Sequence, residues 1–402
     1  QINMNSILTI VFIVLYVYTL ISTISVLLLE NRNPVKSLSW VIVLLFVPVV
    51  GLVFYLIFGQ NFRKKKFISR KSIRSTVDRP QVSFDISKLD DNEMENNQLN
   101  LVKLLYKNGD AEGYAYNKIE IFSEGKSTFE AMFEAIRNAK NHIHLEFFII
   151  GNDKISNYLR ELLIAKAKEG VRVRVIYDYW GSFFLSRMYL QTLRDAGVYL
   201  KPFFPMRLRL GRSKINYRNH RKLLIVDGEI GFTGGVNVAD RYIFGNELGY
   251  WRDTFVRFEG AVVHGLQQLF LTDWYFVERK LITDPKYYPK PKKYRKNLVQ
   301  IVSSGPDNDW ETIMQGIASA IMSATKYVYL HTPYFIPNDV VENCIYMAAL
   351  SGVDVRLMVP SKSDSRLSDA CTSSYLGHVL EAGVRVFKYN EGFLHSKAIV
   401  VD

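Results

Sequence analysis

Two long apolar stretches open the chain. Residues 7–29 contain no charged side chain, and neither do residues 38–58. A helix needs roughly 20 apolar residues to cross the hydrocarbon core of a membrane, and each stretch has that length. The polar gap between them includes Pro34 and suits a tight turn. The pattern predicts a transmembrane helical hairpin over residues 1–60, and the second apolar stretch disfavours a cleaved signal peptide.

A basic segment follows the second apolar stretch. It begins with Arg63, Lys64, Lys65 and Lys66 and leads into a polar linker, together residues 61–110. Basic residues beside membrane spans concentrate on the cytoplasmic side. We therefore expect a multi-pass protein of the cell membrane whose main body lies on the cytoplasmic side. The same side chains would also attract anionic lipid headgroups.

Beyond the linker, a pattern of helices and strands occurs twice. A helical stretch at residues 127–139 leads into an apolar strand that begins at His142, and residues 310–324 lead into a similar strand at Tyr327. In both copies the next helix ends at a glycine before another apolar strand. Glycine after the last helical turn is a C-cap signal, and a short apolar run behind it indicates a buried strand.

This repetition predicts the fold class. Helices that alternate with buried strands favour an α/β sheet with helices on its faces. We expect two pseudo-symmetric lobes, at residues 111–290 and 291–402, related by a pseudo-two-fold axis.

Composition narrows the choice of partner. The 402 residues carry a formal charge of +12 and the sequence pI is about 9.4. Such a basic balance favours nucleic acid, an anionic lipid surface or a phosphate substrate. The two cysteines, Cys344 and Cys371, exclude a disulfide framework and a cysteine zinc site.

Each copy of the repeat ends in the same motif, a histidine, a lysine two residues later and an aspartate five residues after the lysine. The copies are His220-Arg-Lys-Leu-Leu-Ile-Val-Asp and His395-Ser-Lys-Ala-Ile-Val-Val-Asp. The apolar residues after the lysine favour a strand, and residues i and i+2 of a strand share one face. Histidine and lysine should therefore point the same way, whereas the aspartate need not.

These residue types suit chemistry at a phosphodiester. Imidazole can act as a nucleophile or carry a proton near neutral pH, and an ammonium group can neutralise phosphate oxygens. Two copies supply a nucleophile, an opposing acid and two ammonium groups, which is sufficient for a two-step displacement. Lysine is an unusual ligand for a divalent cation, so we expect no metal and no cofactor. We expect His220 and His395 to face each other across one cleft.

The paired motifs resemble those of the phospholipase D superfamily, and further segments resemble bacterial cardiolipin synthases. These segments are Thr233-Gly-Gly-Val-Asn, Tyr250-Trp-Arg-Asp-Thr, Thr332-Pro-Tyr-Phe-Ile-Pro and much of the second apolar stretch. The resemblance covers nearly the whole chain. It implies phosphatidyl transfer between two phosphatidylglycerol molecules, which gives cardiolipin and glycerol through a phosphohistidine intermediate.

The resemblance also implies roles for individual residues. His220 would be the nucleophile, and His395 would protonate the departing glycerol. Asn237 is the expected extra phosphate donor, and Asp253 is the candidate carboxylate that orients His220. The aspartates of the motifs are expected to be structural more than catalytic. The catalytic candidates are the motif residues: His220, Lys222, Asp227, His395, Lys397 and Asp402.

The pattern of the resembled family continues beyond the second motif with a Gly-Ser/Thr-x-Asn segment. Because the sequence ends at Asp402, we expect the second lobe to be incomplete at its C-terminal end. The first residue is Gln1 rather than methionine, so we also expect the natural start to lie upstream.

The motifs leave alternative functions open. A hydrolase of the phospholipase D type would differ only in using water as the acceptor. A nuclease of the superfamily would use the basic charge for a phosphate backbone, but membrane spans disfavour it. A lipid-binding scaffold would not need two intact His–Lys pairs. We therefore expect phosphatidylglycerol, other anionic phospholipids and the membrane as partners, without nucleic acid. A homo-oligomer is compatible with the sequence.

Overall fold

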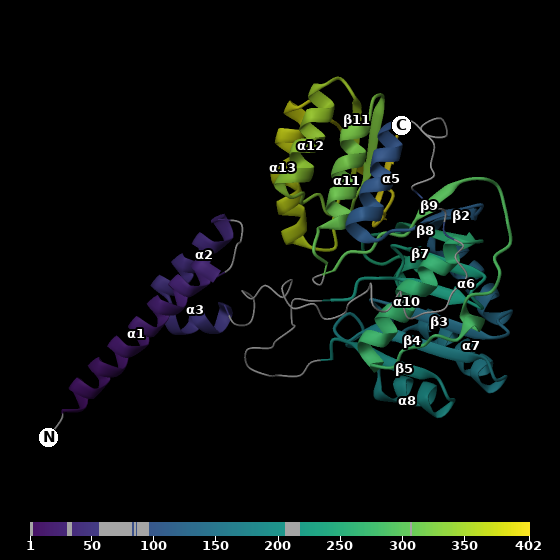
Figure 1. Ribbon diagram of the computed structural model, residues 1–402, viewed down its shortest axis with the longest axis horizontal. Coiled ribbons are helices and arrows are strands. Elements are labelled where there is room, and N and C mark those ends of the chain that lie inside the picture. Colours follow the sequence, from purple (N-terminus) through teal and green to yellow (C-terminus); the bar gives the residue numbers. More distant parts are fainter. Residues whose placement is uncertain are drawn as a thin grey trace. The chain divides into compact units, whose positions relative to one another are not determined.

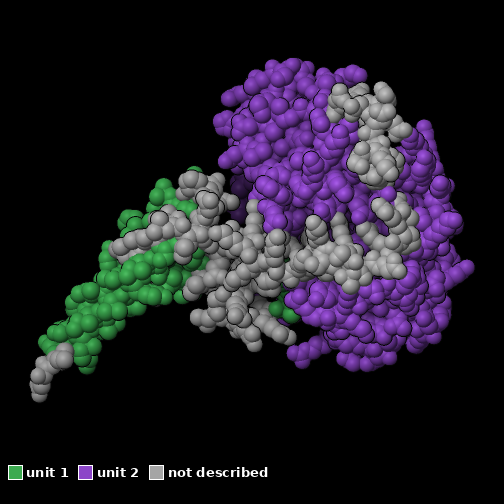
Figure 2. Space-filling model, in the orientation of Figure 1, with its two compact units in different colours: residues 1–66, 204–218 green, residues 67–203, 219–402 purple. Residues whose placement is uncertain are grey.

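The computed structural model describes residues 3–29, 34–55, 83, 86, 96–205, 218–305 and 308–402. The chain divides into two compact units (Figure 2): residues 1–66 with 204–218, and residues 67–203 with 219–402. The predicted basic segment that begins at Arg63 lies outside the described residues.

The first unit is helical. Apolar side chains such as Phe12 and Tyr18 are exposed along the first helix. The prediction of a transmembrane hairpin is not supported by this unit, because no helix within residues 3–29 and 34–55 combines the length and hydropathy needed to cross a membrane. The unit contains α1 (Met4–Leu29), α2 (Pro34–Phe46) and α3 (Pro48–Phe54).

The second predicted span is interrupted by a proline. Pro48 is the first residue of α3, and Val47 before it has a φ of −136° and a ψ of 66°. Proline lacks an amide hydrogen and its ring collides with the carbonyl four residues earlier, so α2 ends there. The rings of Trp40 and Tyr55 lie 5.4 Å apart, whereas one continuous helix would separate these residues by about 22 Å. α3 therefore folds back toward α2, and neither helix has the predicted length.

The second unit contains an eight-stranded mixed sheet in the order β13-β8-β7-β6-β3-β4-β5, with β2 also paired to β8. β3, β4 and β5 are parallel, and β6 runs antiparallel to β3. The strands are β2 (Lys118–Glu124), β3 (His142–Phe147), β4 (Arg172–Asp178), β5 (Tyr199–Phe203), β6 (Leu223–Val226), β7 (Ile230–Gly234), β8 (Trp251–Glu259) and β13 (Phe393–Leu394).

Helices cover both faces of this sheet (Figure 1). The alternating sequence of β3 explains the two different interfaces. Its odd-numbered residues are apolar and share one core with α6 and α7, while His142, His144 and Glu146 project from the opposite side, where Gln267 of α10 contacts both histidines. The helices are α6 (Gly125–Arg137), α7 (Lys154–Lys168), α8 (Arg187–Asp195), α9 (Arg241–Phe244) and α10 (Val262–Glu278), followed by the 3-10 helix η4 (Pro285–Tyr287).

A four-stranded sheet in the order β12-β11-β10-β14 repeats part of this topology. β10, β11 and β12 are parallel and β14 is antiparallel to β10, as β6 is to β3. The predicted internal repeat is therefore present. Its elements are α11 (Thr312–Ser323), β10 (Tyr327–His331), α12 (Asp339–Leu350), β11 (Asp354–Pro360), α13 (Arg366–Glu381), β12 (Arg385–Tyr389) and β14 (Ala398–Val401).

Two further contacts join the lobes within this unit. β1 (Gly113–Ala115) pairs with β9 (Leu298–Gln300). α5 (Asn96–Gly109) precedes the first lobe but packs beside α11 of the second, where Asn108 Nδ2 donates to Gln315 Oε1 at 2.8 Å. The predicted linker thus ends in a helix that belongs to the packed body.

Candidate active site

The histidines of both motifs lie beside strands of the first sheet. His220 and Lys222 directly precede β6, next to β3. In the second motif, β13 pairs in parallel with β8, and the amide of His395 donates to the carbonyl of Arg252 at 2.8 Å. The chain then crosses to β14 in the second sheet. The pairing of β13 with β8, which involves only two residues of β13, therefore places His395 against the first sheet.

In each motif the lysine turns back onto its own histidine. Lys222 Nζ donates to the carbonyl of His220 at 2.8 Å and lies 3.0 Å from Nδ1 of the same ring. Lys397 Nζ donates to the carbonyl of His395 at 2.5 Å and lies 2.9 Å from its Nε2. The i, i+2 spacing therefore places histidine and lysine together, as the sequence predicts.

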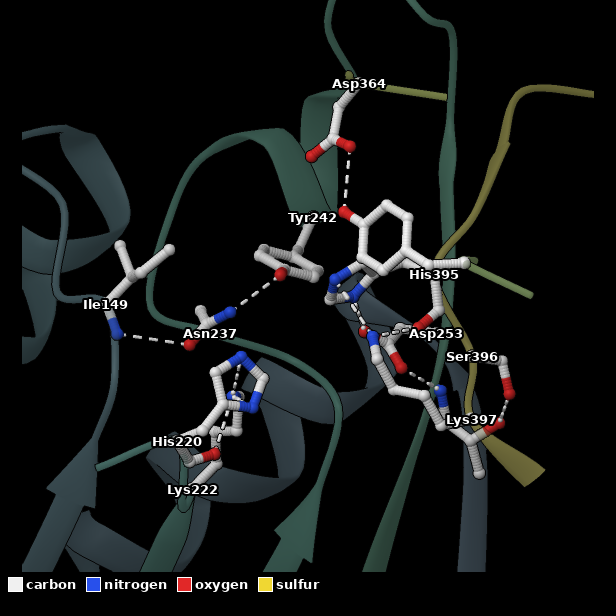
Figure 3. A network of polar contacts seen from close by, with 12 residues as sticks. Ile149, His220, Lys222, Asn237, Tyr242, Asp253, Asp364, His395, Ser396 and Lys397 are labelled. Carbon is white, nitrogen blue, oxygen red and sulfur yellow. Dashed lines mark hydrogen bonds and ion pairs between the residues drawn. The ribbon is translucent and has the colours of Figure 1, made fainter. Parts of the chain in front are cut away.

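The two His–Lys pairs form one cluster (Figure 3). The charge of Lys397 lowers the pKa of both His220 and Lys222, and that of Lys222 lowers the pKa of His395. Such mutual effects require proximity. His220 is exposed, whereas His395 and Lys222 are buried.

Burial controls the charges in this cluster. It is the main cause of the lowered pKa of Lys222, about 7, and of the lowered pKa values of His395 and Lys397. The pKa of His220 is lowered as well, because the protein around the exposed ring displaces part of the solvent and because Lys222 and Lys397 lie nearby. The lowered pKa of His220 keeps its imidazole neutral at neutral pH, so this ring has a lone pair available. The Lys397 ammonium disfavours the charged forms of Lys222 and of both histidines, and a phosphodiester would relieve that repulsion.

Asp253 contacts the histidine of the second motif. Its Oδ2 lies 2.5 Å from Nδ1 of His395, and both side chains are buried. The prediction that Asp253 orients His220 is therefore wrong. β13 brings His395 alongside β8, which carries Asp253, so the carboxylate of the first lobe serves the histidine of the second motif. Within the described chain, no carboxylate forms a hydrogen bond with the His220 ring.

Asn237 lies near His220 and next to Tyr242 (Figure 3). It is buried, its Oδ1 accepts from the Ile149 amide at 3.1 Å, and its Nδ2 donates to the Tyr242 hydroxyl at 2.9 Å. The Tyr242 ring in turn lies 5.9 Å from the His395 ring, measured between centroids. An amide nitrogen carries two hydrogens, so one remains to serve a phosphate oxygen.

The aspartates of the motifs bind backbone amides. The Asp227 carboxylate accepts from the amides of residues 140, 141 and 142, at 2.8, 2.7 and 2.9 Å. Asp402 accepts in the same way from the amides of residues 325, 326 and 327. In both lobes the carboxylate ties the end of the motif strand to the start of the neighbouring strand. A structural role for both aspartates stays our prediction, and these backbone contacts are compatible with it.

Several residues that the sequence did not single out position His220. The Phe148 ring lies 4.6 Å from the His220 ring. The amide of Asn219 donates to Asp178 Oδ2 at 3.0 Å, and its side chain donates to the buried Glu146. Burial, together with the nearby Asp273, raises the pKa of Glu146 well above its usual value.

The second lobe adds Tyr334 and Asp364, whose hydrogen bond is 2.8 Å long. The Tyr334 ring lies 6.5 Å from the His395 ring. Tyr334 belongs to the Thr-Pro-Tyr-Phe-Ile-Pro segment of the resemblance, which was a usable signal. Asp364 lies in the loop that follows the parallel strand β11. Its place at the carboxyl end of this strand was the only sequence signal for a site residue.

Comparison with known proteins agrees with this geometry. The family described as "Cardiolipin synthase, PLD-like domain" matches residues 132–274 and 317–402. The family described as "Phospholipase_D-nuclease N-terminal" matches residues 14–60. The first match includes both motifs, Asn237 and Asp253.

Curated relatives match at high coverage. Cardiolipin synthase 2 of Bacillus anthracis is 41% identical over 388 residues, which cover 94% of this chain and 74% of the relative. Cardiolipin synthase of Alkalihalophilus pseudofirmus is 40% identical over 382 residues, covering 94% and 76%.

A solved structure supports the fold. The phosphatidylserine synthase of Haemophilus influenzae superposes with a TM-score of 0.55 at 15% identity, covering 75% of this chain and 80% of that protein. The sequence matches and the shared architecture together lead to one assignment. The chain belongs to the cardiolipin synthase family of phospholipase D-like proteins.

Proposed function

We propose that this protein is a cardiolipin synthase that transfers a phosphatidyl group from one phosphatidylglycerol molecule to another and releases glycerol. The observation that carries the proposal is the convergence of two His–Lys pairs, one of them bonded to a buried carboxylate. In this arrangement His220 and His395, the latter bonded to Asp253, would flank one site for an anion.

In the first step, a ring nitrogen of His220 attacks the phosphorus. The new P–N bond forms as the bond from phosphorus to the glycerol oxygen breaks, and His395 gives its proton to that oxygen. His220 suits the attack because it is neutral and exposed. His395 suits the acid role because Asp253 accepts from Nδ1 and stabilises the protonated ring. A bound phosphate anion acts in the same direction.

In the second step, a hydroxyl of the second phosphatidylglycerol attacks the phosphohistidine. His395 now removes the hydroxyl proton, the P–N bond breaks, and cardiolipin is released. Because one diester bond is exchanged for another, a covalent intermediate conserves the energy of the bond while the acceptor changes. Lys222, Lys397 and the remaining amide hydrogen of Asn237 would neutralise the phosphate oxygens in both steps.

The cell membrane is the proposed place of action. The supporting observation is the exposed apolar surface of α1, which includes Phe12 and Val14. Buried against lipid, such a helix would hold the body at its substrate. The cytoplasmic side of the membrane stays our prediction for the catalytic body, from the basic segment at Arg63.

The products distinguish the candidate activities. The protein would be mixed with phosphatidylglycerol vesicles, and the lipids separated by chromatography. Cardiolipin and glycerol in equal amounts support the synthase, while phosphatidic acid as the main product would favour the phospholipase D-type hydrolase. A chelator should leave the rate unchanged, and complete loss that one metal restores would contradict the proposed chemistry.

The intermediate can be trapped directly. With 32P-labelled phosphatidylglycerol and a rapid quench at alkaline pH, which preserves phosphohistidine, label should map to the peptide that contains His220. His220→Ala should lose both label and turnover. Label on the His395 peptide would reverse the two roles, and unlabelled protein during normal turnover would argue for direct displacement.

A further inference from the structure

The two lobes carry chemically different loops at equivalent places. In the first lobe, β4 is followed by Tyr179-Trp-Gly-Ser-Phe-Phe, in which Trp180, Phe183 and Phe184 are 41, 54 and 84% exposed. In the second lobe, β11 is followed by the polar Ser361-Lys-Ser-Asp-Ser. β4 lies between β3 and β5, and β11 lies between the equivalent strands β10 and β12, so the two loops occupy equivalent positions in the two lobes.

Each loop adjoins a different histidine. Asp178 accepts from the Gly181 amide at 2.9 Å and from the Asn219 amide at 3.0 Å, which links the aromatic loop to the residue before His220. The polar loop reaches His395 through Tyr334, whose hydroxyl donates to Asp364.

The polar loop holds Asp364 in place. The Ser363 hydroxyl donates to Asp364 Oδ1 at 3.2 Å, and the Ser363 amide donates to Asp369 at 2.9 Å. Tyr334 also donates to Oδ1. Oδ2 accepts no hydrogen bond from any described residue, and the Asp364 residue is exposed. One carboxylate oxygen is therefore fixed while the other is open to a ligand.

A carboxylate is an unexpected neighbour for a phosphate site. Asp364 is close enough to raise the pKa of Lys397, so it must also repel a bound phosphodiester. The cost of this repulsion is offset if Asp364 binds a neutral group that has several hydrogen-bond donors. A carboxylate accepts hydrogen bonds at both oxygens, so it suits adjacent hydroxyl groups, which can donate as a pair.

We infer that Asp364 and Tyr334 form a subsite for the vicinal hydroxyls of glycerol, beside His395. This inference rests on the proposed transfer reaction and names its headgroup site. In an in-line displacement the leaving oxygen lies opposite the nucleophile, which places glycerol on the His395 side if His220 attacks. In the second step, the glycerol hydroxyl of the acceptor lipid attacks from the same place. The exposed aromatic loop is linked through Asp178 to Asn219, the residue before His220, so it would suit the diacylglycerol portion.

The partition of the intermediate between acceptors tests this subsite. The full-length protein would be given phosphatidylglycerol vesicles with equal concentrations of radiolabelled glycerol and 1-propanol, which has one hydroxyl. The ratio of labelled phosphatidylglycerol to phosphatidylpropanol compares acceptors after a shared first step. A hydrogen bond to a charged group contributes about 1.5–3 kcal/mol, so Asp364→Asn should lower this ratio roughly ten- to hundred-fold. Tyr334→Phe should lower it less.

Glu381→Gln is the matched control. Glu381 is exposed at the opposite end of α13, the helix that follows Asp364, and its loss removes the same charge from the same lobe. The control should keep the wild-type ratio. An unchanged ratio in both Asp364→Asn and Tyr334→Phe would overturn the subsite, as would equal losses for both acceptors. If the wild-type protein makes neither cardiolipin nor an alcohol product, the proposed function itself fails.

Discussion

His220 and His395 occupy the same position in two copies of one motif, yet their surroundings differ. His395 is buried against Asp253, whereas His220 is exposed and contacts Phe148 and its own lysine. A carboxylate makes imidazole a better proton carrier, and exposure makes the other ring accessible to phosphorus. The two residues are therefore suited to different steps of one reaction.

Asp253→Asn tests this division of roles. The amide keeps the size of the side chain but no longer stabilises a protonated His395. We expect kcat to fall roughly 100- to 10,000-fold, the usual contribution of general acid–base catalysis, while the phosphohistidine on His220 still forms with an activated donor that needs no acid. Rapid-quench kinetics with phosphatidylglycerol and with a p-nitrophenyl phosphodiester would separate the two effects. Equal losses with both donors would contradict the assignment.

The rate should also fall in alkaline solution. The lowered pKa of Lys222, about 7, means that its ammonium form dominates below this pH and is lost above it. An anionic substrate needs that charge, so kcat/KM should decline as the pH rises from 7 to 9.

Lys222→Arg provides the comparison, because guanidinium stays charged throughout this range. At pH 6 the kcat/KM of this variant should be lower than that of the wild-type protein. Its decline should begin at a pH at least one unit higher than in the wild-type protein. Superimposable pH profiles of the two proteins would exclude Lys222 as the titrating group.

The sequence predicted the identity of the motif residues and missed one partner. Spacing places Lys222 beside His220 because both lie on one short extended segment. Which histidine contacts Asp253 depends on the strand that pairs with the edge of β8. That strand is β13, which has only two residues and leads directly into His395. Local periodicity contains no information about such a long-range contact. Asp364 was missed for the same reason, since its loop has no signal of its own.

At the scale of elements, Asp227 and Asp402 have matching functions. Each ends a motif strand and accepts from the amides at the start of the adjacent antiparallel strand. The helices predicted at residues 127–139 and 310–324 correspond to α6 and α11 with shifts of about two residues, because amphipathic periodicity locates helices well. The second apolar stretch was predicted as one span, but Pro48 divides it into α2 and α3.

Asp227→Ala should affect stability more than catalysis. It leaves three amides without their acceptor, and a lost partner of this kind costs about 1–3 kcal/mol. We expect a corresponding decrease in the free energy of unfolding, measured by urea denaturation in detergent. At a temperature where both proteins are folded, kcat/KM should change less than ten-fold. A stable but inactive variant would instead give Asp227 a catalytic role.

At the scale of the whole molecule, the N-terminal unit should determine where the body works. A charged side chain in the hydrocarbon region costs roughly 2.5–3.5 kcal/mol near its centre. Ile13→Asp combined with Val17→Asp, both on exposed positions of α1, should lower the carbonate-resistant membrane fraction.

Ser6→Asp at the start of α1 is the control and should remain with the membrane. Activity in detergent micelles should be similar in all these proteins, because the His–Lys cluster belongs to the other unit. Unchanged membrane retention of the double variant would show that α1 is not the attachment.

The pairing of β13 with β8 has a consequence for the protein during its synthesis. The first lobe precedes β13 in the chain, so it is synthesised with His220 and Lys222 but before His395, the proposed proton donor. His395 arrives only when the later part of the chain adds a strand to the finished first sheet. We therefore expect an incompletely synthesised chain to bind a phosphodiester without cleaving it.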